Sequence, residues 1–159
     1  MLLENKNAVI YGGGGSVGGA VAFAFAREGA NIYLAGRTLE SLEEVAKQIR
    51  SAGGAAETAQ VDALDEQAVV EHADAVAASA GGIDVSFNLI SVGDVQGTPL
   101  AEMPLEDFER PVMTAVRTQF LTSRAAARHL IPQGSRIRSG THHDCNSTEY
   151  KLWCDRGLG

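Results

Sequence analysis

Apolar runs and amphipathic stretches alternate along the chain. Four short runs have the length and composition of buried strands, and they cover residues 8–11, 31–35, 57–61 and 83–90. Elsewhere apolar residues recur every three or four positions, and this spacing predicts helices over residues 17–28, 39–52, 66–80 and 105–131. The pattern therefore predicts that strands and helices alternate through residue 131.

Single residues mark the ends of these predicted helices. Thr38 and Asp65 can cap the second and third helix, because their side-chain oxygens accept hydrogen bonds from the first free amides. Glycines follow the first three helices, as at Gly29, where a left-handed residue can end a helix. Pro111 lies inside the fourth helix and is expected to kink it.

The order of these elements indicates the fold class. A strand–helix unit recurs roughly every 25–30 residues, which is typical of parallel strands joined by right-handed crossovers. The predicted class is α/β, with a Rossmann-like, doubly wound parallel sheet of four strands. Such a sheet should continue with an apolar fifth strand, but residues 135–139, Ser-Arg-Ile-Arg-Ser, are a poor candidate for a buried one.

Residues 135–159 differ from the rest of the chain in composition. Seven of these 25 residues are apolar, and they follow neither a helical nor a strand period. We therefore expect a folded α/β domain over residues 1–134 and an atypical, poorly ordered tail over residues 135–159. A frameshifted or truncated reading frame is the simplest hypothesis for such a tail.

Length and charge narrow the class of protein further. A chain of 159 residues fits one domain, and its 13 basic and 20 acidic residues give a net charge of −7. The negative charge argues against a nucleic-acid binder, which needs a basic face. No apolar run approaches the roughly 20 residues of a membrane span, and the first residues do not have the pattern of a secretory signal. The expected compartment is the cytoplasm.

Cysteine and histidine are concentrated near the end of the chain. Both cysteines and two of the four histidines lie in the last 25 residues, and two cysteines do not make a disulfide framework. The side-chain types of a zinc site are present in His142, His143, Asp144, Cys145 and Cys154. Their spacing fits no common structural zinc pattern, and no predicted element would fix their geometry, so no metal site is expected.

A glycine-rich turn, residues 12–16, joins the first predicted strand to the first predicted helix. Glycine lets the backbone turn sharply and approach a pyrophosphate, and the free amides of the following helix then face the anion. Such a run is also typical of a flexible linker or a plain turn, but the flanking strand and helix favour a dinucleotide site. The residues expected to contact the dinucleotide here are Gly12, Gly14, Gly15, Ser16, Val17 and Gly18.

This turn and the motifs after it resemble the short-chain dehydrogenase/reductase family over roughly residues 6–134. The family's glycine signature, Thr-Gly-x-x-x-Gly-x-Gly, aligns here with Tyr11, Gly12, Ser16 and Gly18. Its first and last glycines match, whereas its threonine and middle glycine do not. Asn88 begins the segment Asn-Leu-Ile-Ser, where the family has Asn-Asn-Ala-Gly. The resemblance implies an NAD(P)-binding, Rossmann-like domain.

The resemblance also implies which other residues would hold the cofactor. These are Arg37, Thr38, Asp62, Asn88 and Ile90. At the position of residues 36–37 an acidic side chain would bind the ribose of NAD, whereas the guanidinium of Arg37 suits the 2′-phosphate of NADP. NADP is therefore favoured over NAD, unless Arg37 is only a solvated charge. Asp62 can hold adenine or cap the turn before the third helix, and Asn88 can simply bind backbone at its strand end.

The family's catalytic residues have no match in this sequence. The resemblance implies a Ser that orients the substrate oxygen, a Tyr that exchanges its proton, and a Lys four residues after that Tyr. Four residues after Tyr150 stands Cys154, and a helical Asn of the family aligns with Ala115. Ser139, Tyr150 and Lys151 have no helical pattern to bring them together, so no catalytic residue is assigned.

Three functional hypotheses follow. The chain resembles an NADP-dependent short-chain oxidoreductase, which transfers hydride between a carbonyl and an alcohol, but it is expected to be inactive without the catalytic set. Alternatively it is a non-catalytic NADP(H)-binding or regulatory module, or a partly folded product without function. A small-molecule substrate is expected only for a complete chain. Self-association into a homo-oligomer would use an incomplete interface, because the family pairs the long helix with a later one.

Overall fold

The computed structural model describes residues 1–134. Within them four strands and four long helices alternate, with one short 3-10 helix, η1, before the last helix. The strands are β1 (Asn7–Tyr11), β2 (Asn31–Gly36), β3 (Ala55–Gln60) and β4 (Val85–Asn88). The helices are α1 (Ser16–Arg27), α2 (Leu39–Ser51), α3 (Glu66–Ala80), η1 (Leu100–Glu102) and α4 (Leu105–Leu130).

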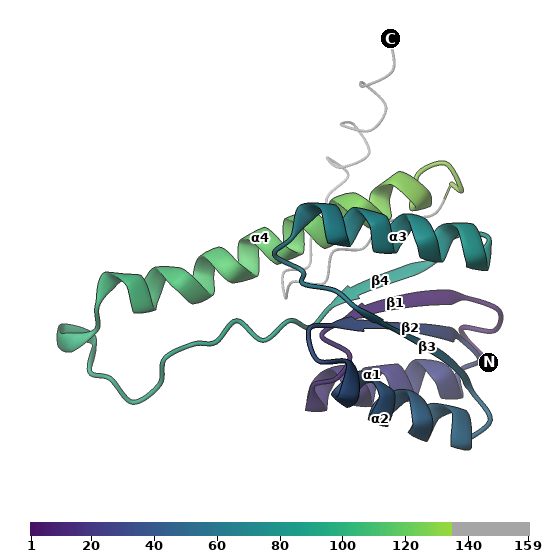
Figure 1. The fold of residues 1–159 in the computed structure, drawn as a ribbon, viewed down its shortest axis with the longest axis horizontal. Coiled ribbons are helices and arrows are strands. Elements are labelled where there is room, and N and C mark those ends of the chain that lie inside the picture. The colour runs from purple at the N-terminus through teal and green to yellow at the C-terminus, as the bar shows by residue number, and fades with distance from the viewer. Residues whose placement is uncertain (135–159) are drawn as a thin grey trace, which may run out of the picture.

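The four described strands form one parallel sheet in the order β3-β2-β1-β4. Helices α1 and α2 cover one face of this sheet, and α3 and α4 cover the other (Figure 1). Side chains alternate across the sheet, so Ala8 and Ile10 of β1 pack toward α1 and α2, while Val9 and Tyr11 pack toward α3 and α4. The predicted Rossmann-like, doubly wound α/β fold is confirmed.

Helix ends follow the sequence signals in one case and depart from them in another. Asp65 is the N-cap of α3, and its carboxylate accepts hydrogen bonds from the amides of Gln67 at 2.9 Å and Ala68 at 3.2 Å. Thr38 occupies the N-cap position of α2, but its hydroxyl makes no capping hydrogen bond, so the predicted cap is wrong in its chemistry. Instead the hydroxyl of Ser41 donates to the carbonyl of Thr38 at 2.9 Å.

The boundaries of two strands also differ from prediction. The sequence predicts the third strand over residues 57–61, whereas β3 runs from Ala55 to Gln60. It begins two residues earlier because its pairing with β2 starts at Asn31↔Ala55. β4 is limited to Val85–Asn88, since its ladder with β1 spans only those residues. The helix α4 continues through Pro111 as a single element of 26 residues.

Helix α4 is long and only partly covered. At about 1.5 Å per residue it extends about 39 Å, and its first half projects beyond the sheet (Figure 1). Its buried residues lie in the second half and are Thr118, Leu121, Thr122, Ala125, Ala126 and Leu130. Its exposed large apolar residues lie between the start of the helix and Phe120, and they are Leu105, Phe108, Val112, Met113, Val116 and Phe120. Of the helices in residues 1–134, none is both long enough and apolar enough to cross a membrane.

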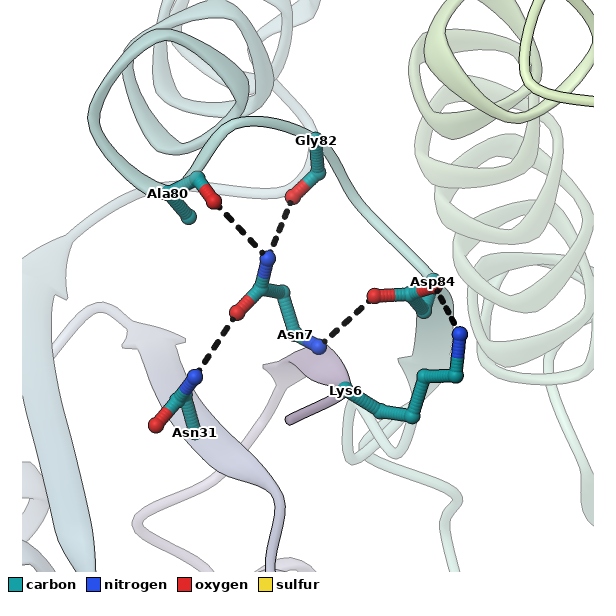
Figure 2. Close-up of polar contacts among 6 residues, drawn as sticks. All are labelled: Lys6, Asn7, Asn31, Ala80, Gly82 and Asp84. Carbon is teal, nitrogen blue, oxygen red and sulfur yellow. Dashed lines mark hydrogen bonds and ion pairs between the residues drawn. The ribbon is translucent and has the colours of Figure 1, made fainter. Parts of the chain in front are cut away.

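A network of hydrogen bonds centred on Asn7 joins β1 to its neighbours near the amino ends of the strands (Figure 2). The buried side chain of Asn7 donates to the carbonyls of Ala80 and Gly82, at 3.1 Å each, and accepts from the Asn31 side chain at 3.0 Å. The carboxylate of Asp84 accepts from the Asn7 amide at 2.9 Å and from the Lys6 ammonium at 2.9 Å. This network ties β1 to β2, to the end of α3 and to the start of β4.

Several sequence predictions concern residues outside the described range of 1–134. These are the fifth strand at residues 135–139, the poorly ordered tail, the disfavoured zinc site at residues 142–145 with Cys154, and the rejected set Ser139, Tyr150 and Lys151. They remain predictions.

Candidate functional site

The candidate cofactor residues meet at one edge of the sheet. Because β1 to β4 are parallel, their carboxyl ends lie along the same edge. The glycine turn follows β1, Arg37 follows β2, Asp62 follows β3, and Asn88 ends β4. The chain runs outward from β1 to β2 and β3 and then crosses to β4 on the other side of β1. The strand order therefore reverses between β1 and β4, which is where ligands bind in open α/β sheets. The fold thus brings together side chains that the sequence spreads over almost 80 residues.

A Cβ would overlap other atoms at three positions of the glycine turn, Gly12, Gly13 and Gly14, and at Gly18 in the first turn of α1. Gly12 has a φ of +79°, and a Cβ there would overlap the carbonyl of Leu89. A Cβ on Gly18 would overlap the carbonyl of Gly12, and one on Gly14 would overlap the Ser41 hydroxyl. The first and last glycines of the motif therefore let α1 begin directly against the end of β1.

Gly15 is different, and it marks the open side of the turn. A Cβ there would meet only the Gly12 carbonyl, at an ordinary 3.4 Å, and Gly15, Ser16 and Val17 are all exposed. Backbone bonds within the turn run from Gly15 N to Gly12 O at 3.1 Å and from Gly19 N to Gly15 O at 2.7 Å. Ser16 and Val17 begin α1, so within residues 1–134 their amides have no backbone acceptor.

These free amides give the turn the chemistry of an anion site. Hydrogen-bond donors at a helix N-terminus point along the axis, and the helix dipole adds partial positive charge there. No acidic residue lies in the first turn of α1 to offset it. The residues present therefore fit a pyrophosphate group, which would approach over Gly15 without meeting a side chain.

Arg37 and Thr38 lie at the end of β2, next to this turn. Both are exposed, and the main chain of Arg37 is held by the Gln60 side-chain amide, which donates to the Arg37 carbonyl at 2.9 Å. Among the described residues the Arg37 guanidinium makes no ion pair with an acidic side chain. Its positive charge, beside the amino end of α2, can therefore pair with a bound anion.

Asp62 has a structural task that its sequence position also predicted. Its carboxylate accepts a hydrogen bond from the Leu64 amide at 3.0 Å, and its carbonyl accepts from the Asp65 amide at 3.0 Å. Asp62 therefore orders the turn that leads into α3, as in the capping alternative. Its side chain is exposed at the same edge as Arg37, and contact with adenine stays a prediction.

Asn88 is held from both sides. Its side-chain oxygen accepts from the Ile90 amide at 3.0 Å, which is the backbone contact expected at the strand end. Its side-chain nitrogen donates to the hydroxyls of Thr118 at 3.2 Å and Thr122 at 3.4 Å, both on α4. Nothing in the sequence marked these threonines as partners, because they lie 30 and 34 residues further on.

Two tyrosines, Tyr11 and Tyr33, lie among the described residues. Tyr11 is 2% exposed and its phenol faces His72, and burial raises the pKa of Tyr11 far above its usual value. Burial and the nearby Glu57 carboxylate raise the pKa of Tyr33 as well. Neither phenol therefore has the lowered pKa that would favour its ionised form near neutral pH.

No cluster of three metal-ligating side chains occurs within residues 1–134. Two histidines lie in the described part of the chain, and both are half-buried. Desolvation lowers the pKa of His72, whose ring contacts Tyr11, and His129 lies 2.8 Å from the Asp74 carboxylate. The chemistry of this edge is therefore that of backbone amides, one guanidinium and polar side chains.

Comparison with known proteins agrees with this geometry. The family model for short chain dehydrogenases matches residues 6–139. An uncharacterised oxidoreductase of Bacillus subtilis (strain 168) is 38% identical over 130 residues, which cover 82% of this chain and 46% of that protein. The chain spans about half the length of the curated relatives it matches.

Two solved structures superpose closely on this fold. A metagenomic short-chain oxidoreductase in complex with NADP has a TM-score of 0.76 and 30% identity, over 85% of this chain and 61% of that one. An NAD+-bound xylitol dehydrogenase has a TM-score of 0.75 and 30% identity, over 85% of this chain and 52% of that one.

Proposed function

This chain belongs to the short chain dehydrogenase family, and from that premise we propose that residues 1–134 bind NADP(H) along the carboxyl edge of the sheet. The observation that carries the proposal is the open glycine turn. Its free amides at Ser16 and Val17 and the unobstructed approach over Gly15 suit a pyrophosphate. The proposed contacts are the glycine-turn residues 12 and 14–18, Arg37, Thr38, Asp62, Asn88 and Ile90.

The preference for NADP over NAD rests on Arg37. Its exposed guanidinium lies beside the start of α2 without an acidic partner in the described part of the chain. A 2′-phosphate there would accept hydrogen bonds from the guanidinium and form an ion pair with it, whereas the neutral 2′-hydroxyl of NAD has no charge to pair. One of the two superposed structures holds NADP and the other NAD+, so the likeness of fold favours neither cofactor. The proposed preference for NADP therefore rests on the charge of Arg37 alone.

We further propose that the 159-residue chain binds the cofactor without transferring hydride. Hydride transfer in this family needs a tyrosine with a lysine four residues later, and the printed sequence has no such pair. The carbonyl or alcohol chemistry of the family, and a substrate, are proposed only for a polypeptide that supplies those groups. A chain that binds NADP(H) in this way would act as a non-catalytic binding or regulatory module, and its binding part would be the same glycine turn.

Calorimetric titration with NADPH and NADH tests the binding proposal. We expect NADPH to bind more tightly than NADH, and Arg37→Glu to weaken NADPH binding by tenfold or more with little change for NADH. Arg27→Glu makes the same charge change at the far end of α1 and should leave both affinities unchanged. Absence of binding by either nucleotide contradicts the proposal.

An activity assay tests whether the chain transfers hydride. NADPH consumption is followed with a panel of aldehydes and ketones, and the 159-residue chain is expected to show none above the rate without protein. Carbonyl-dependent consumption that Gly18→Asp abolishes would overturn the inactive assignment. Cooperative thermal unfolding with tight NADPH binding and no turnover supports the binding module, whereas a broad transition supports a product without function.

Three further parts of the proposal have simple tests. Self-association is proposed through the exposed apolar residues of α4 and is taken up in the Discussion. The cytoplasmic compartment is tested by cell fractionation.

The frameshift hypothesis for residues 135–159 is tested by resequencing the coding DNA from codon 130 and translating all three frames. An apolar strand followed by a Tyr-x-x-x-Lys motif in a shifted frame is the expected result.

A further inference from the structure

Helix α4 carries two buried hydroxyls where its other buried positions are apolar. Thr118 and Thr122 are each 1% exposed and stand one helical turn apart, among Leu121, Ala125 and Ala126. A buried hydroxyl costs free energy unless it is hydrogen-bonded, and valine would fill the same volume without that cost. Both hydroxyls face the side chain of Asn88 at the end of β4.

The hydrogen-bond directions in this group are determined by its carbonyl acceptors. The Thr118 hydroxyl donates to the Ala115 carbonyl at 3.3 Å, and the Thr122 hydroxyl donates to the Thr118 carbonyl at 2.8 Å. Each hydroxyl has one proton, so both oxygens can then only accept from the Asn88 side chain. The amide nitrogen of Asn88 has two protons, and it donates one toward each threonine.

This arrangement fixes the orientation of the Asn88 amide group. With its nitrogen directed at α4, its oxygen is directed at the backbone and accepts from the Ile90 amide at 3.0 Å. A flipped amide would place two donors against each other at the Ile90 amide, and its oxygen would find a proton only if a threonine hydroxyl left its carbonyl acceptor. The threonine hydroxyls and the Ile90 amide therefore favour the same orientation of the Asn88 amide group.

The backbone held in this way lies directly against the glycine turn. The Leu89 amide donates to the Tyr11 carbonyl at 2.8 Å, and a Cβ on Gly12 would overlap the Leu89 carbonyl and the Ile90 amide nitrogen. A shift of residues 89–90 would therefore displace Gly12, which starts the turn. A continuous path of contacts runs from Thr118 through Asn88 to the candidate cofactor edge.

We propose that Thr118 is a positioning residue for this edge: through Asn88 it holds residues 88–90 against Gly12, and so raises the affinity for the nicotinamide dinucleotide. The effect on affinity rests on the proposed function, whereas the effect on the backbone does not. The Thr118 oxygen lies 3.2 Å and the Thr122 oxygen 3.4 Å from the Asn88 nitrogen, and Thr118 is the one chosen for the test. Thr118 does not contact reacting atoms in this assignment.

The test compares Thr118→Val, which keeps the shape, with Thr118→Ser, which keeps the hydroxyl. Thr114→Val is the matched control, because it removes a hydroxyl one turn earlier on α4 that makes no hydrogen bond in the described residues. Hydrogen exchange at the Ile90 amide is measured by NMR in the nucleotide-free 159-residue chain, and NADPH affinity is measured by fluorescence titration. Exchange at the Ile10 amide reports global stability in each variant.

In Thr118→Val we expect Ile90 to exchange faster than in the unmodified chain, beyond any change at Ile10. NADPH affinity should fall about threefold to tenfold, the effect of one lost hydrogen bond. Thr118→Ser should restore both values to within twofold, and Thr114→Val should change neither.

Three results would overturn the positioning role. They are unchanged exchange at Ile90 in Thr118→Val, equal losses in Thr118→Val and Thr118→Ser, and faster exchange with unchanged NADPH affinity. If the unmodified chain binds no nucleotide, the proposed function fails instead. Exchange at Ile90 then still decides whether Thr118 holds the backbone.

Discussion

The phenol oxygen of Tyr11 lies 3.5 Å from Nδ1 of His72, and the two rings meet edge to face with centroids 5.7 Å apart. Tyr11 belongs to β1 and His72 to α3, so the pair joins the sheet to the helix that covers it. Burial raises the pKa of Tyr11 and lowers the pKa of His72. Both side chains are therefore held in their neutral forms near neutral pH.

The protonation of His72 should make stability depend on pH. Because burial lowers the pKa of His72 below its ordinary 6.5 in the folded state, the unfolded chain takes up the proton first as pH falls. The contribution of neutral His72 to the free energy of unfolding is thus present above pH 6.5. It is lost as the pH falls below 6.5, by up to about 1.4 kcal/mol per pH unit. Urea unfolding between pH 5 and pH 8 should show this loss, and His72→Gln should lack it. Equal pH slopes in the two proteins would contradict the assignment.

The closely packed Gly18 and the open Gly15 should respond differently to substitution. Gly18→Ala places a methyl group against the Gly12 carbonyl and should lower the free energy of unfolding by about 1–3 kcal/mol. Gly15→Ala has room for its methyl group, so stability should change by less than about 1 kcal/mol while NADPH binding weakens. Thermal unfolding and nucleotide titration of both variants provide the check. Equal losses of stability would show that the turn is not packed as described.

The network around Asn7 should be a major local source of stability. Asn7→Leu leaves the carbonyls of Ala80 and Gly82 without their donor and should cost about 2–3 kcal/mol. Asn31→Leu removes only one bond, to the Asn7 oxygen, from a half-buried position and should cost about 1 kcal/mol. Denaturant unfolding of both variants measures the difference. A smaller cost for Asn7→Leu than for Asn31→Leu would refute this ranking.

The exposed apolar residues of α4, from Leu105 to Phe120, should drive self-association. Val116 is 61% exposed and Phe120 is 58% exposed, and exposed apolar residues continue along the helix back to Leu105. An exposed apolar surface of this kind is typical of a protein–protein contact. Val116→Glu should therefore shift the chain toward monomer in sedimentation velocity runs at several concentrations. Arg117→Gln changes net charge equally at an exposed neighbour and should leave the distribution unchanged. A chain that is monomeric at every concentration rules out this association.

Much of the fold was predictable because its signals are local. The alternation of short apolar runs with helical spacing predicted four parallel strands and their helices, and the carboxylate of Asp65 caps α3 as expected. The glycine motif predicted the turn at the end of β1, and the family resemblance is confirmed. Thr38 shows the limit of such reasoning. It is a residue type that often caps helices and it stands at the N-cap position of α2, yet its hydroxyl makes no capping hydrogen bond.

What the sequence by itself determined is where strands, helices and the glycine turn lie, because each depends on neighbours a few residues away. Only the tertiary structure decided which distant side chains meet, such as Asn88 with Thr118 and Tyr11 with His72, separated by 30 and 61 positions. Those contacts depend on strand order and on which face each helix covers. A buried polar side chain must find a hydrogen-bond partner, but its identity depends on packing across the sheet, which sequence periodicity does not encode.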